Sequence, residues 1–170
     1  MPNKKDNQFY ITTPIYYVND VPHLGHTYTT VAADALARYH RWIGNKTFFL
    51  TGTDEHGAKI AEKAKSLGIP PQQFVDQIAV SFKLAWDELD ISNDNFIRTT
   101  DFAHIKAVQN ALQIIYDKGD IYKGKYRGLY CQGCEQYKSE KDLIKGLCPD
   151  HKIAPQILEE ECYMFKLSKY

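Results

Sequence analysis

The sequence has no run of about 20 apolar residues, the length that a membrane-spanning helix needs, and its residues 1–8 are polar. It therefore shows neither a membrane span nor a signal peptide, and we expect a cytoplasmic protein with no membrane partner. It also has no excess of either charge. Because 21 Lys and Arg residues balance 21 Asp and Glu residues, the composition gives no argument for nucleic-acid binding. Repeats and low-complexity tracts are absent, which excludes a solenoid.

The composition is that of an ordinary globular chain. Of its 170 residues, 44% are hydrophobic and 25% are charged, which excludes disorder. This length suits one compact domain, or one domain with a small insert. The chain has only four cysteines, and thiols in a cytosolic protein stay reduced. Their spacing is therefore interpreted first as metal binding or catalysis.

The order of apolar segments predicts an α/β fold with a parallel sheet. A strand at 8–13, a helix from 28 to 43 and a strand at 47–51 would form a right-handed βαβ unit. The pattern continues with helices over 56–67 and 70–89, a strand at 96–99, and a helix from about 101 that Gly119 ends. After Gly119 it changes to short segments over 121–130, a Cys-rich stretch and a last strand at 162–167. We therefore expect two parts, residues 1–119 and 120–170.

The Cys-rich stretch has the spacing of a metal site. Cys131 and Cys134 form a CxxC pair, Cys148 and His151 form a CxxH pair, and 13 residues separate the two. Two such pairs match a closed, tetrahedral, structural zinc site. Two alternatives stay open: the cysteines are buried free thiols, or Cys162 replaces His151 as the fourth ligand.

A second group of polar residues follows the first predicted strand. His23 and His26 flank Gly25 where the first long helix should begin, at the carboxyl end of a parallel strand. Two histidines three residues apart share one face of a helical turn and can both donate to a phosphate. Gly25 would let a flat ring such as a nucleobase approach the backbone. The alternative is that these histidines are caps or surface residues.

A third group follows the second predicted strand. Asp54, Glu55 and His56 lie between Gly52 and Gly57. Two carboxylates at the same sheet edge as the histidines predict a site for a substrate amine or a ribose. A turn with a helix N-cap would use similar residues.

These motifs resemble those of the class I aminoacyl-tRNA synthetases. The segment 23–26, His-Leu-Gly-His, is similar to the HIGH signature of that class. The runs 12–19 and 51–57 resemble the bacterial methionyl-tRNA synthetase family, and the segments 96–100, 128–131 and 146–149 agree with it. The resemblance spans nearly the whole chain.

The resemblance implies ATP-dependent activation of methionine to methionyl-adenylate, with Mg²⁺ accompanying ATP, and transfer of methionyl to tRNA(Met). It implies the N-terminal half of a Rossmann-like catalytic domain in residues 1–119. Residues 120–170 would be a truncated zinc-binding connective insertion. In it, Cys131, Cys134, Cys148 and His151 would hold the metal.

The resemblance also assigns roles to single residues. Ile15 and Tyr17 match positions that line the methionine pocket, and Asp54 matches the carboxylate that receives the substrate ammonium group. The remaining matches concern ATP and catalysis: His23 and His26 steady the triphosphate, and Gly25 lies under the adenine.

One motif of the class is missing. The Lys-Met-Ser-Lys-Ser signature belongs to the other half of the catalytic fold, and it does not occur before Tyr170. We therefore expect an N-terminal fragment with little or no aminoacylation activity alone.

Three other functions remain as alternatives. A cysteinyl-type class I synthetase also holds zinc, although its metal reads the substrate thiol inside the catalytic pocket. A small nucleotidyltransferase would share the histidine motif alone. A non-catalytic module that binds zinc and nucleotide would bind ATP without turnover.

Overall fold

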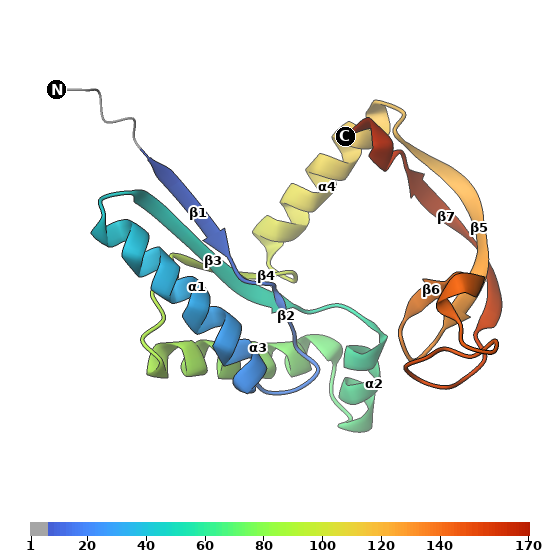
Figure 1. Ribbon diagram of the computed structural model, residues 1–170, viewed down its shortest axis with the longest axis horizontal. Coiled ribbons are helices and arrows are strands. Elements are labelled where there is room, and N and C mark those ends of the chain that lie inside the picture. The colour runs from blue at the N-terminus through green and yellow to red at the C-terminus, as the bar shows by residue number, and fades with distance from the viewer. Residues whose placement is uncertain (1–6) are drawn as a thin grey trace. The chain divides into compact units, whose positions relative to one another are not determined.

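The computed structural model describes residues 7–170 (Figure 1). The chain divides into two compact units, Met1–Val108 and Gln109–Tyr170. The predicted boundary at residue 119 follows the end of helix α4 (Phe102–Asp117), and the assignment of a catalytic half and an insertion stays a prediction. Among the described residues, no helix is long and apolar enough to cross a membrane.

The first unit contains a four-stranded parallel sheet, so the predicted α/β class is confirmed. Its central strand is β3 (Lys46–Asp54). Strands β1 (Gln8–Thr12) and β2 (Tyr16–Tyr17) pair with successive parts of one edge of β3, and β4 (Asn95–Arg98) pairs with the other edge. All three pairings are parallel. The carboxyl ends of the four strands therefore lie along one side of the sheet, where open α/β sheets bind their ligands.

Three helices accompany this sheet: α1 (Leu24–Trp42), α2 (Ala58–Ser66) and α3 (Pro71–Glu88) (Figure 1). Ala33 and Ala37 of α1 bury Phe49 of β3. The larger core joins Tyr16 and Val18 to α2 and α3, whose fully buried side chains include Phe82 and Trp86. The core thus holds the end of β2 against two helices.

Two local differences from the sequence prediction concern this unit. Helix α1 begins at Leu24, not at Tyr28, because His23 caps it. Strand β2 was not predicted, because Pro14 interrupts the edge after β1 and only two residues pair beyond it.

The second unit is built on a long antiparallel hairpin. Strand β5 (Ile121–Cys131) pairs with β7 (Gln156–Phe165) along nearly its whole length, and β6 (Gln136–Lys138) pairs with the end of β5. Two short 3₁₀ helices, Glu140–Asp142 and Leu167–Lys169, complete the unit.

The prediction of short segments over 121–130 was wrong, because β5 is one continuous strand. The strand predicted at 162–167 is present, but it begins earlier, at Gln156, and ends at Phe165. Strand β5 continues through Gly124 and Gly128. An added Cβ would lie 2.9 Å from Met164 at the first position and 2.8 Å from Tyr137 at the second. The glycines therefore make room for side chains of the neighbouring strands.

Candidate active site and metal centre

Two histidines close the N-terminus of α1. His23 is the N-cap, with an extended backbone, and its Nδ1 accepts the backbone N–H of Gly25 at 3.0 Å. The Nδ1 of His26 accepts the backbone N–H of His23 at 3.2 Å. The two rings stack with their centroids 3.8 Å apart. This arrangement is a capping box in which both side chains are imidazoles.

The cap determines what each imidazole can offer to a ligand. Because Nδ1 accepts a backbone N–H, the proton of each neutral ring lies on Nε2, which is then a donor. Burial, and then the neighbouring His23, lower the pKa of His26. The helix N-terminus adds unpaired N–H groups and a positive dipole. The arrangement suits an anion such as a phosphate.

Gly25 has a steric reason to lack a side chain. A Cβ at this position would lie 2.9 Å from Cε1 of His23. A larger residue would therefore push the His23 ring out of its cap. The approach of a nucleobase to Gly25 stays a prediction.

Tyr16 links the end of β2 to the histidines, and sequence reasoning missed it. Its hydroxyl hydrogen-bonds with Thr30 of α1 at 2.7 Å, and its ring lies 4.8 Å from that of His26. The ring also stacks on Phe82 of α3. Strand alternation was the available signal, since it places Tyr16 on the opposite face from Ile15 and Tyr17.

Ile15 and Tyr17 lie at the same end of the sheet as the histidines, where the carboxyl ends of the strands meet. Ile15 is 41% exposed, and Tyr17 is half-buried. Tyr17 pairs with Asp54 across the two strands. A Cβ on Gly57 would lie 2.4 Å from the Tyr17 hydroxyl oxygen, so the turn after β3 fits against this tyrosine. The structure therefore brings together Tyr17 and Asp54, two residues that the sequence places far apart.

The three polar residues after β3 have different surroundings. Asp54 is half-buried, and its carbonyl accepts the backbone N–H of Val18 at 3.3 Å. Glu55 is buried and forms an ion pair with Arg98 of β4, with Nε to Oε1 at 2.7 Å. His56 is exposed. The sequence predicted that two carboxylates bind a substrate amine or a ribose. Because Glu55 is paired with Arg98, only the Asp54 carboxylate of the two is left for that role.

The predicted metal ligands converge in the second unit. One ligand atom from each of Cys131, Cys134, Cys148 and His151 lies within 4.8 Å of the other three. Cys162 is not in this group, and its Sγ instead lies 3.6 Å from Sδ of Met164. The structure thus favours His151 over Cys162 as the fourth ligand.

The distances fit a tetrahedral ion. Zinc–sulfur bonds of about 2.3 Å separate two thiolates on one ion by about 3.7 Å. The Sγ atoms of Cys134 and Cys148 are 3.4 Å apart, and Sγ of Cys134 lies 3.3 Å from Nδ1 of His151. Gly133 packs under the ring of His151, since a Cβ there would lie 2.5 Å from it. The donor set suits zinc.

Backbone groups also prepare Cys148 to be a ligand. The hydrogen bond from the backbone of His151, together with those from its side chain, from Cys134 and from the backbone of Asp150, outweighs burial and lowers the pKa of the Cys148 thiol to about 6. Burial and the neighbouring Cys148 and Cys131 raise the pKa of the Cys134 thiol to about 12, so in the absence of a metal the negative charge of this cluster lies on Cys148. Thiolate is the form that binds metal.

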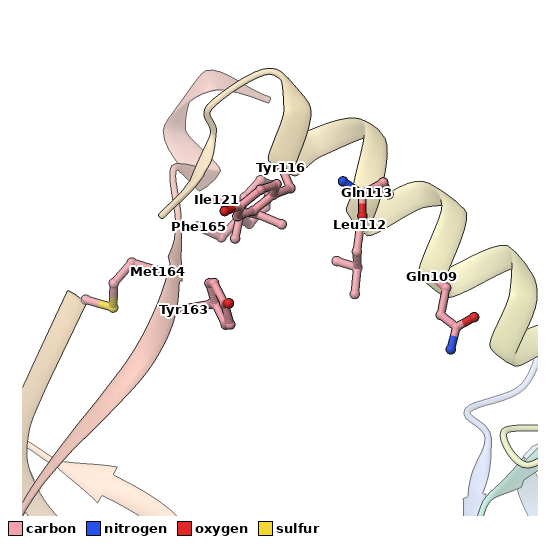
Figure 2. Close-up of a pocket in the computed structure, with 8 residues that line it drawn as sticks. All are labelled: Gln109, Leu112, Gln113, Tyr116, Ile121, Tyr163, Met164 and Phe165. Atoms are coloured by element: carbon pink, nitrogen blue, oxygen red, sulfur yellow. The ribbon is translucent and has the colours of Figure 1, made fainter. Parts of the chain in front are cut away.

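A separate apolar hollow of about 780 Å³ lies in the second unit, between the end of α4 and β7 (Figure 2). Leu112 and Tyr116 face Tyr163 and Phe165 across it. None of its lining residues carries a charge, and none is among the predicted site residues.

Comparison with known proteins decides the family. The family model described as tRNA synthetases class I (M) matches residues 9–169. The chain belongs to the class I tRNA synthetases (M). Both groups of sheet-edge residues and all four candidate metal ligands of this class I synthetase chain lie inside the matched range.

Individual relatives agree with the family. The chain is 54% identical over 171 residues to the methionine–tRNA ligase of Streptomyces coelicolor, covering 95% of this chain and 32% of that protein. It is 54% identical over 162 residues to the methionine–tRNA ligase of Campylobacter jejuni, covering 95% of this chain and 26% of that protein. The chain thus spans a third or less of the length of these relatives.

A solved structure has the same fold. The Mycobacterium tuberculosis methionyl-tRNA synthetase in complex with methionyl-adenylate matches with a TM-score of 0.85 and 38% identity. The match covers 96% of this chain and 33% of that chain. It includes both units of this class I synthetase chain.

Proposed function

We propose that the protein to which this chain belongs is a methionine–tRNA ligase. It would use ATP to convert methionine to methionyl-adenylate, and then transfer methionyl to tRNA(Met). The observation that supports this most is at the carboxyl end of the sheet: two imidazole donors close the N-terminus of α1, the ring of His26 lies 4.8 Å from that of Tyr16, and the next residue, Tyr17, pairs with Asp54. The match to the M family favours methionine over the cysteinyl alternative.

The first half-reaction, the activation of methionine by ATP, requires these residues to position the substrates and to stabilise charge. The methionine carboxylate attacks the α-phosphate of ATP, and pyrophosphate leaves in line. The protein then contributes position and positive charge, and it needs no nucleophile of its own. Nε2–H of His23 and of His26 would donate to the phosphate oxygens as their charge grows, and Gly25 would lie under the adenine. Mg²⁺ bound with ATP would neutralise part of the phosphate charge.

Methionine would bind at the same carboxyl end of the sheet, at residues other than those that contact ATP. Asp54 would accept the substrate ammonium group, and Ile15 and Tyr17 would contact the thioether side chain. A thioether is soft and has no strong polar group, so shape and aromatic contact must supply most of the selectivity.

Residues 131–151 would hold a structural zinc ion. Four protein ligands fill a tetrahedral site and leave no open position for chemistry, so the ion would stabilise the loops beyond β5. The cytoplasmic location expected from the sequence stays a prediction.

The role of Asp54 can be tested by amino-acid-dependent ATP–pyrophosphate exchange on the longest chain that the gene encodes. We expect Asp54→Asn to raise the KM for methionine by about 10- to 100-fold, the effect of losing a charged hydrogen bond, with little change in the KM for ATP. Glu62→Gln, which removes one exposed carboxylate from α2, is the matched control. An unchanged KM for methionine in Asp54→Asn would contradict the proposed amino-acid site.

A further inference from the structure

A buried carboxylate next to Asp54 has no part in the proposed chemistry. The side chain of Glu55 is completely inaccessible, and its oxygens accept hydrogen bonds from Thr53 at 2.6 Å and from Nε and Nη2 of Arg98 at 2.7 and 2.9 Å. The hydroxyl of Thr100 also donates to it. Four donors therefore surround one carboxylate.

The main chain of Glu55 is held as well. Its backbone N–H donates to Oγ1 of Thr99 at 2.8 Å, and the backbone N–H of Thr99 donates to the carbonyl of Thr53 at 3.2 Å. The turn after β3 is thus fixed to the end of β4 through both its side chain and its backbone.

Arg98 extends this network to a helix. Its Nη2 lies 2.5 Å from Oδ1 of Asp76 in α3. One guanidinium therefore bridges the carboxylates of Glu55 and Asp76, and a planar fork of this kind fixes direction as well as distance. An apolar pair of similar size would stabilise a fold as well as a buried ion pair, so stability alone does not explain the network.

The network acts on Asp54 through strand geometry. Thr53 and Glu55 point to the buried face, so alternation turns Asp54 toward the other face. The same turn places Gly57 against the hydroxyl of Tyr17. A shift of Glu55 would therefore move both Asp54 and the surface on which Tyr17 rests.

We propose that Glu55 and Arg98 are positioning residues for the amino-acid site. By fixing the turn 54–57 to β4, they hold the Asp54 carboxylate and the Tyr17 ring in the arrangement that binds the substrate ammonium group and side chain. This inference rests on the proposed function, because it concerns the same site.

The test uses exchange kinetics on the longest chain that the gene encodes, with Glu55→Gln, Arg98→Lys and the milder Thr100→Val. Glu55→Gln keeps the shape and removes the charge, and Arg98→Lys keeps the charge and removes the fork. We expect each of these two to raise the KM for methionine by about 10-fold and to leave the KM for ATP within about twofold. Thr100→Val removes one of four donors, so its KM for methionine should rise by less, about two- to fivefold. The control is Glu62→Gln, which removes an exposed carboxylate of α2 outside the network and should change neither KM.

The outcomes separate this inference from the proposed function. If Asp54→Asn raises the KM for methionine but folded Glu55→Gln, Arg98→Lys and Thr100→Val do not, the positioning role is wrong and the amino-acid site stands. A fall in melting temperature with an unchanged KM for methionine would also overturn it, since a merely structural network predicts that result. If Asp54→Asn itself has no effect, the amino-acid site is wrong.

Discussion

At the scale of the residue, His23 and His26 each use one ring nitrogen for the fold and leave the other for a ligand. Nδ1 of each ring closes the capping box, and Nε2 remains as a donor. The structural and chemical roles of these residues can therefore be separated by substitution.

Asparagine at position 23 should keep the cap and lose the donor. Because asparagine is among the best N-cap residues, we expect His23→Asn to change the free energy of unfolding by less than about 0.5 kcal/mol. Exchange activity should fall by about 100-fold, the usual cost of one donor to a developing charge. Thermal unfolding and pyrophosphate exchange on the same preparation measure the two effects. Full activity in His23→Asn would show that His23 only caps α1.

Asp34 fixes α1 to the loop before β4. Its Oδ1 accepts the backbone N–H of Ser92 at 2.7 Å and the Ser92 hydroxyl at 2.6 Å, and Oδ2 accepts Nε of Arg38 at 2.6 Å. Burial alone would raise the pKa of Asp34. The hydrogen bonds from Ser92 and the charge of Arg38 outweigh it, so the pKa lies below the usual 3.8.

This lowered pKa predicts a pH-dependent contribution to stability. The ionised carboxylate stabilises the folded state above about pH 4, and the contribution is lost as the pH falls through the folded-state pKa. We expect Asp34→Asn to lower the free energy of unfolding by about 2 kcal/mol at pH 7, the cost of a hydrogen bond to a charged group. Urea titrations of both proteins at pH 7 and pH 3 should show the difference shrinking at the lower pH. A difference that stays constant would mean that the charge of Asp34 contributes nothing.

At the scale of the element, the loops beyond β5 depend on the four candidate ligands. We expect one zinc per chain by elemental analysis, and Cys134→Ser should lose most of it, because a missing thiolate leaves an incomplete tetrahedron. Cys162→Ser is the matched control and should keep the metal, since Cys162 lies outside the cluster. Equal metal loss in both variants would contradict the assignment.

The elements also show what the sequence could and could not predict. The βαβ order and the metal-ligand spacing were predictable, because apolar periodicity and CxxC pairs are local signals. The apolar periodicity placed the start of α1 at residue 28, although the histidine motif indicated a helix start near residue 23, where His23 caps the helix. The continuous β5 was missed because a glycine that admits a neighbouring side chain looks, in sequence, like a glycine that breaks a strand. The pairing of Glu55 with Arg98 depends on register between β3 and β4, which no local pattern reveals.

At the scale of the whole molecule, the chain spans a third or less of the relatives it matches. We propose that the residues at the carboxyl end of its sheet bind and orient methionine and ATP, and the expectation that the 170-residue chain has little activity alone stays a prediction. At the scale of the whole molecule we therefore propose that methionine is activated at the carboxyl end of the parallel sheet.

The most direct test is ATP–pyrophosphate exchange by the longest chain that the gene encodes, with methionine compared against cysteine, leucine and isoleucine. The 170-residue chain is assayed in parallel. We predict exchange that methionine alone stimulates, and little or none from the shorter chain. A folded, zinc-loaded long chain that shows no methionine-dependent exchange would contradict the proposed function.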